Sequence, residues 1–341
     1  MTKTTEPAQT PWRDLYRSMC RIRAFEDAAE EASQGSVAAF GQALVAASPV
    51  RGPLHLSTGQ EAVAAGVCAH LRPDDPITST HRGHGHTLAK GADMTRMMLE
   101  LFGKAGGFCA GKGGSMHIAD FSVGMLGANG VVAAGMPIAV GAAHSLKIRA
   151  MPGVAVAFFG DGAINRGPFG ESLNWAACFS LPLLFVCEDN QWSSTTRTDA
   201  MSAGAGPLER ARSYGVDGES VDGMDIEAVW AAAGRLIAAV RAGGGPRMLH
   251  ARTYRFKGHV SVDKAAYRDP SEVEAAVARD PLSLARSRMI AAGQPIDALE
   301  AIEQAARDEV RMALAAASDA PFPTPDAAYD EVQDTGRGQW T

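Results

Sequence analysis

The stretches VAVAFFGDGAINRG, residues 154–167, and LPLLFVCEDN, residues 181–190, decide the fold. Each opens with a short apolar run, VAVAFF or LPLLFV, that is typical of a strand buried on both faces of a sheet. Between them, residues 168–179 have helical spacing, and Pro168 suits a first helical turn. A strand, a helix and a second strand joined by a right-handed crossover predict a parallel sheet, and therefore an α/β fold.

Polar side chains follow both predicted strands. Asp161 lies in the turn Gly160-Asp161-Gly162, and Asn190 follows the second strand, 190 − 161 = 29 residues later. Ligands of α/β sheets bind at the carboxyl ends of the strands, so we expect both side chains to meet there. Carboxylate and amide oxygens suit Mg²⁺, and the turn exposes backbone N–H groups to a diphosphate at a helix N-terminus. Gly-Asp-Gly alone is equally typical of an ordinary polar turn; the following Asn190 favours the metal site.

The rest of the chain adds helices and one strand. We expect helices that begin near Pro11 and cover 59–71 and 93–102, with Asp93 as N-cap, and a strand over 248–254. After Pro281 the chain is predicted to be helical, and one apolar stripe is expected to pack on a partner: Leu299, Ile302, Ala306, Val310 and Leu314.

The chain is predicted to have one domain. Residues 1–10 are expected to be a flexible leader, 11–320 a single domain with helical N- and C-terminal extensions, and 321–341 a C-terminal tail. The Ala-, Gly- and Ser-rich segment 35–53 is predicted to be a mobile loop or a short hairpin.

Composition excludes several classes of protein. The 341 residues are 46% hydrophobic with a net charge of −6, which argues against a nucleic-acid binder that relies on overall positive charge. Five cysteines without a Cys-x-x-Cys pair indicate buried thiols in a reducing compartment. The apolar run 131–143 is broken by two glycines and a proline, and the N-terminus resembles neither a signal nor a transit peptide. We therefore expect a cytoplasmic protein with no membrane and no nucleic-acid partner.

Three other motifs offer competing chemistries. The run GFCAGKG from Gly107, preceded by Gly106, lacks the Ser or Thr that a nucleoside-triphosphate loop places after Lys112, so a flexible glycine loop is favoured. Gly160-x-Gly162 is an incomplete dinucleotide-binding fingerprint, because Asn165 takes the place of the third glycine. If Glu188 bound the ribose of a dinucleotide, the chain would be an NAD-dependent oxidoreductase, which is the remoter alternative.

The third motif is a cluster of three histidines, His81, His84 and His86, around Arg82. Three imidazoles could bind zinc, but the guanidinium between them would repel a cation and no cysteine is close in sequence. Arginine and histidine on a glycine-rich loop suit an anion such as phosphate better, with a solvated polar loop as the alternative.

Across residues 15–317 the chain resembles the alpha subunit of the thiamine diphosphate-dependent first component of acetoin and 2-oxo acid dehydrogenase complexes. The segments that carry the resemblance are HLSTGQEA from His55, STHRGHGH from Ser79, GKGGSMHIAD from Gly111, GMLGANGVV from Gly124, FFGDGAINRG from Phe158 and TYRFKGHVSVD from Thr253. STHRGHGH and GMLGANG look more like the acetoin branch than the mammalian pyruvate branch. The resemblance implies the thiamine diphosphate-binding fold, a central mostly parallel sheet flanked by helices.

The resemblance also implies a site with thiamine diphosphate and Mg²⁺ as cofactors. Mg²⁺ would be held by Asp161, Asn190 and the Trp192 carbonyl. The diphosphate would lie among His81, Arg82, Arg255, His259 and the turn Gly160, Asp161, Gly162 and Ala163, with Gln60 nearby. The Gly130 carbonyl and the Val132 N–H would bind the aminopyrimidine, and His55 and His259 would face the thiazolium and the substrate as proton donors or orienting groups.

The implied function is cleavage of a carbon–carbon bond next to a carbonyl and transfer of the acyl group to a lipoyl group on an acyltransferase. Acetoin is the favoured substrate, with pyruvate or a branched-chain 2-oxo acid as the alternative. The family's activating glutamate belongs to a beta subunit, so we expect an α₂β₂ heterotetramer and an inactive isolated chain. A non-catalytic protein with this fold is disfavoured by the joint presence of Asp161, Asn190, Arg82, His55 and His259.

Some positions depart from the family pattern. Asp189 replaces the first residue of the usual Asn-Asn, where an added carboxylate is expected to shift metal affinity, and Gly170 stands where acetoin members tend to have histidine. Segment 36–50 looks longer than usual; if it lines the substrate channel, a substrate other than acetoin becomes an open alternative. Val260 replaces the serine that mammalian relatives phosphorylate, so that switch is not supported, and Ser261 is a weak substitute.

Overall fold

The computed structural model describes residues 11–34, 48–50 and 52–330. Their centre is a six-stranded sheet in the order β2-β1-β3-β4-β8-β7, in which every neighbouring pair is parallel. The strands are β1 (Ile77–Thr78), β2 (Met125–Gly127), β3 (Ala155–Gly160), β4 (Leu183–Asp189), β7 (Gly218–Asp222) and β8 (Arg247–Arg252). A short antiparallel hairpin, β5 (Trp192–Ser193) with β6 (Thr196–Arg197), follows β4. The predicted α/β class with a mostly parallel sheet is confirmed.

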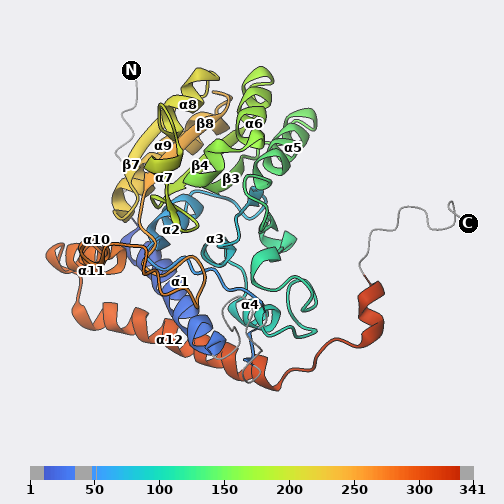
Figure 1. The fold of residues 1–341 in the computed structure, drawn as a ribbon, viewed down its shortest axis with the longest axis vertical. Coiled ribbons are helices and arrows are strands. Elements are labelled where there is room, and N and C mark those ends of the chain that lie inside the picture. The colour runs from blue at the N-terminus through green and yellow to red at the C-terminus, as the bar shows by residue number, and fades with distance from the viewer. Residues whose placement is uncertain (1–10, 35–47, 51, 331–341) are drawn as a thin grey trace, which may run out of the picture.

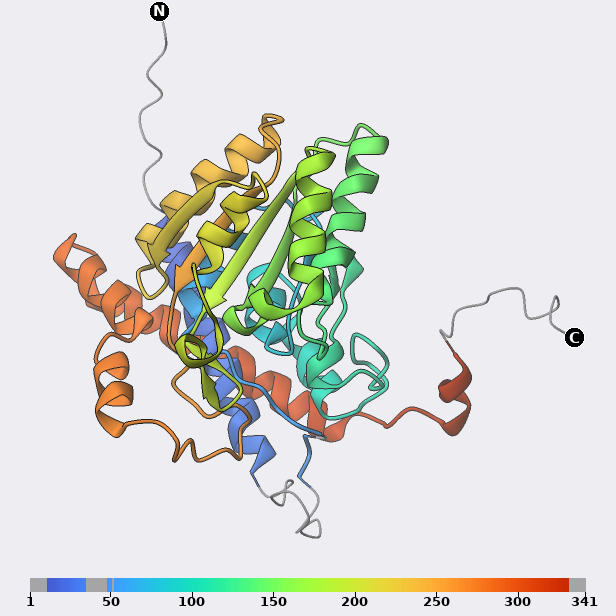
Figure 2. The ribbon, with the colours of Figure 1, turned by 45° about the horizontal axis from the view of Figure 1, so that its top comes forward.

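Helices cover both faces of this sheet (Figures 1 and 2). On one face lie α5 (Gly135–Ile148), α6 (Gly167–Cys178) and α8 (Pro207–Ser213); on the other lie α2 (Glu61–Cys68), α3 (Gly83–Ala89) and α9 (Ile226–Arg241). Successive residues of a strand point to opposite faces, and Phe158 and Phe159 accordingly enter different apolar clusters. Both faces of β3 and β4 are therefore buried from solvent, which explains the uninterrupted apolar sequence of these strands.

The terminal helices pack on each other rather than on a separate partner. The apolar stripe of α12 (Ile296–Asp319) lies against α1 (Trp12–Ser33) and α4 (Met94–Leu101), and α1 and α12 cross at the bottom of Figure 1. Four of the five stripe residues are buried and Leu314 is partly buried. The prediction of a partner for this stripe was wrong, because the chain supplies its own covering helix.

Several local predictions are confirmed. Helices α2, α4 and α6 lie within the predicted ranges, give or take one residue, and the Asp93 side chain caps α4 by accepting a hydrogen bond from the Arg96 N–H. The helical region after Pro281 is two helices, α11 (Pro281–Ala291) and α12, which Gly293 separates with a φ of +82°. The remaining helices are α7 (Thr198–Met201), α10 (Pro270–Val277) and the 3₁₀ turns η1 (Ser115–His117), η2 (Phe121–Val123), η3 (Asp161–Asn165) and η4 (Pro325–Tyr329).

The apolar run 131–143 contains the start of α5, where a proline is tolerated because the first helical turn has N–H groups without an intrahelical acceptor. The predicted leader 1–10, residues 35–47 of the predicted loop and residues 331–341 of the tail lie outside the described residues. No helix in the described ranges has the length and apolarity needed to cross a membrane.

Candidate cofactor and substrate site

A cavity with about 980 Å³ of empty space, part of it open to solvent, lies at the carboxyl ends of β3 and β4. Its mixture of apolar walls with a few converging polar groups is that of a ligand pocket. Every site residue that the family resemblance implies lines it: His55, Gln60, His81, Arg82, Gly130, Val132, Gly160, Asp161, Gly162, Ala163, Asn190, Trp192, Arg255 and His259.

Asp161 and Asn190 follow neighbouring strands at one edge of the cavity. In the sheet Gly160 is paired with Glu188, so the two chain segments leave β3 and β4 side by side. Gly162 is required locally, because a Cβ there would lie 2.4 Å from the Ser193 hydroxyl oxygen. The structure therefore brings the predicted carboxylate and amide to the same pocket wall.

The hydrogen bonds of these two side chains suit a cation. The Asn190 Nδ2 group donates to Gln60 Oε1 at 3.0 Å, and Asn190 Oδ1 accepts from the Trp192 N–H at 3.2 Å. Asp161 accepts from the Thr198 hydroxyl. Burial raises the pKa of Asp161 to about 6, despite the Thr198 hydrogen bond, and the Asp189 charge adds to the rise. A divalent cation would offset this cost, so the site fits Mg²⁺.

Two arginines supply positive charge to the same cavity. Arg82 donates to the carbonyls of Leu56 and His259, at 2.7 and 2.9 Å, and Arg255 donates to the carbonyl of Ser194 at 3.1 Å. Both are buried, and within the described chain neither forms an ion pair with a carboxylate. Burial and repulsion from Arg255 lower the pKa of Arg82 to about 9. Burial and repulsion from Arg268 lower the pKa of Arg255 to about 10. Buried guanidinium groups without a carboxylate in direct contact fit a diphosphate.

A polar atom without a partner supports the same fit. In the described structure Gln60 Nε2 is buried and makes no hydrogen bond, although Gln60 Oε1 holds Asn190. A buried donor left unpaired is costly, and an acceptor in the cavity would satisfy it. The chemistry of the carboxylate, amide and guanidinium groups thus matches a magnesium diphosphate.

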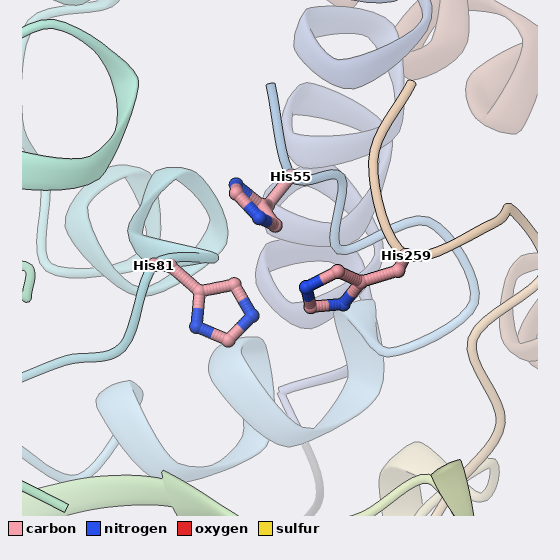
Figure 3. Close-up of side chains that lie close together, drawn as sticks. All are labelled: His55, His81 and His259. Carbon is pink, nitrogen blue, oxygen red and sulfur yellow. The ribbon is translucent and has the colours of Figure 1, made fainter. Parts of the chain in front are cut away.

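Three imidazoles form another part of the cavity wall (Figure 3). The ring centroids lie 4.5 Å apart for His55 and His81, 4.9 Å for His55 and His259, and 5.5 Å for His81 and His259. Burial and the nearby Arg82 lower the pKa of His55 to about 3 and that of His259 to about 4, and they lower the pKa of His81 still further. All three rings are therefore neutral near pH 7.

The histidine-rich motif divides between two environments, which corrects the prediction of one anion-binding loop. His84 lies in α3, away from the cavity, and is fully buried. Its Nδ1 is 3.0 Å from Glu26 Oε2 and its Nε2 is 2.9 Å from Ser115 Oγ. Glu26 also accepts from the N–H and hydroxyl of Ser57. His84 therefore ties α1, α3 and η1 together.

His86 holds a second buried carboxylate. Its Nδ1 is 2.8 Å from Ser79 Oγ, its Nε2 is 3.2 Å from Glu188 Oε1, and its ring stacks on Phe158. Ser79, Phe158 and Glu188 line the cavity, but His86 does not. Neither zinc binding by the contiguous motif nor a solvated loop describes this arrangement. Glu26 and Thr198 were missed as site-supporting residues, and no sequence motif signals either of them.

The departures from the family pattern have structural consequences. The Asp189 carboxylate is hydrogen-bonded to His250 Nε2 at 2.9 Å and lies outside the cofactor cavity. It therefore acts on Asp161 only through its charge, which raises the pKa of Asp161. Gly170 faces Tyr214, whose hydroxyl would be 2.6 Å from a Cβ at that position. A histidine there would require Tyr214 to move.

Comparison with known proteins gives the family. The profile of the dehydrogenase E1 component matches residues 34–326. The chain is 44% identical over 312 residues to the alpha subunit of acetoin:2,6-dichlorophenolindophenol oxidoreductase of Bacillus subtilis, covering 91% of this chain and 89% of that protein. It is 41% identical to the same-named subunit of Cupriavidus necator, with 93% and 92% covered. It is 37% identical to the pyruvate dehydrogenase E1 component subunit alpha of Zymomonas mobilis, with 94% and 87% covered. The chain belongs to the dehydrogenase E1 component family, as an alpha-subunit homologue in a family of thiamine diphosphate- and Mg²⁺-dependent oxidoreductases.

Proposed function

We propose that the chain is the alpha subunit of a dehydrogenase that cleaves acetoin next to its carbonyl group and passes the acyl unit to lipoamide. The assignment of acetoin as the substrate rests on sequence identity to the relatives. The chain is 44% and 41% identical to acetoin-oxidising subunits, and 37% and 35% identical to two pyruvate dehydrogenase subunits. Pyruvate or a branched-chain 2-oxo acid is the second candidate, because those relatives also align over nearly the whole chain.

Residues of this chain would hold the cofactor at both ends. Asp161, Asn190 and the Trp192 carbonyl would bind Mg²⁺, and Arg82 and Arg255 would bind the diphosphate. When bound, thiamine diphosphate supplies a carbon nucleophile and an electron sink. Backbone groups of Gly130 and Val132, which line the same cavity, would bind the aminopyrimidine.

Imidazoles line the substrate end of the cavity. His55 and His259 are neutral near pH 7, so each could accept a hydrogen bond from a substrate hydroxyl and orient it. Acetoin carries such a hydroxyl.

Two partners belong to the proposal. The relatives from Bacillus subtilis and Cupriavidus necator are named alpha subunits, which supports assembly with a beta subunit that carries the activating glutamate, as α₂β₂. A lipoyl-bearing acyltransferase would receive the acyl group. A cytoplasmic location, without membrane or nucleic-acid partners, stays a prediction. An NAD-dependent oxidoreductase is not supported, because the family uses thiamine diphosphate.

The test is reduction of 2,6-dichlorophenolindophenol by the chain co-expressed with the neighbouring beta-type chain. We expect kcat/KM for acetoin to exceed that for pyruvate and for 2-oxoisovalerate at least about tenfold, or about 1.4 kcal/mol in transition-state binding. A co-expressed Asp161→Ala variant, which lacks a proposed metal ligand, is the inactive control. A higher kcat/KM for either 2-oxo acid would replace the acetoin assignment.

A further inference from the structure

We propose that Glu272, a carboxylate outside the cofactor cavity, is a positioning residue for the Mg²⁺ site. The inference rests on the proposed function, because it concerns the Trp192 carbonyl that would bind this ion. Glu272 lies in the first turn of α10 and does not line the cavity. It also lies beyond the last segment of the family resemblance, which ends at Asp263.

Glu272 accepts hydrogen bonds from three side chains that are distant in the sequence. Its Oε1 accepts from Trp192 Nε1 at 3.0 Å and from the Tyr254 hydroxyl at 2.9 Å. Its Oε2 accepts from the Arg197 guanidinium at 2.7 Å. One carboxylate therefore joins α10 to the β5–β6 hairpin and to the segment that follows β8.

Two of these donors lead directly to proposed ligands of the ion. Trp192 itself carries one of them, its carbonyl. Arg197 precedes Thr198, whose hydroxyl donates to the Asp161 carboxylate. The hairpin that Glu272 holds thus reaches two of the three proposed Mg²⁺ ligands.

The backbone on either side of Trp192 needs support from outside the hairpin. Gln191 and Ser194 have φ angles of +67° and +56°, in the left-handed region that residues with a side chain rarely adopt. Such conformations cost free energy and persist only where surrounding contacts hold them. Trp192 pairs with Arg197 across the hairpin, so Glu272 bonds both members of one cross-strand pair.

The helix that carries Glu272 makes few other contacts. No residue of α10 is buried; Val273 and Ala276 pack, partly buried, on an apolar cluster that includes Trp192. The Glu272 side chain is 27% exposed. Its substitution is therefore expected to loosen the hairpin without leaving a cavity in the core.

Glu272→Gln keeps the size of the side chain and breaks part of this connection. The amide has one acceptor oxygen, and its NH₂ group would face either Arg197 or the pair Trp192 and Tyr254, all of which donate. We expect the Mg²⁺ concentration for half-maximal binding of thiamine diphosphate to rise about tenfold, as is typical when a group that orients a metal ligand is removed. Saturating Mg²⁺ is expected to restore cofactor binding.

Calorimetric titration with thiamine diphosphate at a series of Mg²⁺ concentrations measures this change without a substrate. The protein is the full-length chain, co-expressed with its beta-type partner and freed of cofactor. The matched control is Glu274→Gln, on an exposed position of the same helix, which should leave the Mg²⁺ requirement unchanged. Asp161→Ala, which removes a proposed metal ligand, sets the scale of the effect.

Two further measurements separate positioning of the hairpin from a general loss of structure. Hydrogen exchange of the backbone N–H groups in residues 191–198 should be faster in Glu272→Gln and unchanged in Glu274→Gln. Trp192→Phe removes the indole N–H and keeps the carbonyl, so it gives a result even where Glu272→Gln does not fold. It should raise the Mg²⁺ requirement in the same direction.

An unchanged Mg²⁺ requirement in Glu272→Gln, where Asp161→Ala raises it, would overturn this inference and leave the proposed cofactor site intact. No change in either variant would instead refute the proposed Mg²⁺ site itself, and the inference with it. A loss of cofactor affinity in Glu272→Gln that saturating Mg²⁺ does not restore would assign Glu272 a purely structural role.

Discussion

At the scale of single residues, Asp161 is a proposed Mg²⁺ ligand that would link metal binding to pH. Its pKa is raised to about 6 by burial, so protons and Mg²⁺ would compete for the same carboxylate in the range where the enzyme can be assayed. Below this pKa the carboxylate is increasingly protonated, and affinity for Mg²⁺ falls with the pH.

We expect Mg²⁺-dependent binding of thiamine diphosphate to weaken about tenfold between pH 7 and pH 5, since about one-tenth of the Asp161 carboxyl groups remain ionised at the lower pH. Quenching of tryptophan fluorescence at varied Mg²⁺ measures this, because Trp192 lines the cavity. Asp161→Asn should bind Mg²⁺ weakly with a flat pH profile. Equal affinity of the wild-type protein at both pH values would contradict the role of Asp161.

At the scale of elements, the stripe of α12 stabilises the chain by covering α1. Leu299 is fully buried in a cluster with Leu15 and Met19, whereas Met312 on the same helix is 64% exposed. We expect Leu299→Ala to lower the free energy of unfolding by about 3 kcal/mol, because it leaves a cavity, and Met312→Ala to change it by less than about 0.5 kcal/mol. Urea unfolding followed by circular dichroism measures both. Equal effects would show that α12 does not depend on this contact.

The glycine-rich segment 107–114 is held by one buried carboxylate. Glu100 Oε2 accepts from the N–H groups of Cys109 and Gly111, at 2.8 and 3.0 Å, and Oε1 accepts from those of Gly113 and Gly114, at 2.8 and 3.0 Å. The segment is therefore an anchored loop rather than the flexible glycine loop expected from its composition.

Glu100→Gln is expected to cost about 3 kcal/mol of unfolding free energy, because the new amide NH₂ would face two backbone N–H donors in a buried site. Chemical denaturation measures the loss. Glu171→Gln, on an exposed position of α6, is the matched control and should be neutral within about 0.5 kcal/mol. A stability loss no larger than that of the control would show that the carboxylate charge is dispensable.

At the scale of the whole molecule, activity is expected only in the assembled complex. The described lining of the cavity has two carboxylates: Asp161, the proposed metal ligand, and Glu188, which is hydrogen-bonded to His86. Neither is free to activate the aminopyrimidine, which supports the proposal that a beta subunit supplies the activating group. We expect the isolated chain to show less than about 1% of the dye reduction of the co-expressed α₂β₂ complex, with sedimentation giving the assembly state. Full turnover by the isolated chain would refute the requirement for a beta subunit.

Sequence by itself determined the parallel sheet and the place of the two proposed metal ligands. Two buried apolar strands with a helix between them predict parallel pairing. The carboxyl ends of parallel strands lie at one edge of the sheet, so Asp161 and Asn190 had to converge at that edge. The family profile and the relatives agree with the motif-based assignment. The helix stripes were also visible, because apolar spacing of three and four residues is a local property.

Only the tertiary structure decided which of the neighbouring histidines share an environment. His81 lies before α3, while His84 and His86 are two residues apart within it and so point about 200° apart around the helix axis. One reaches Glu26 and the other Glu188, which are 58 and 102 residues distant in the chain. The partners of a side chain depend on packing between distant segments, and no local pattern encodes that packing.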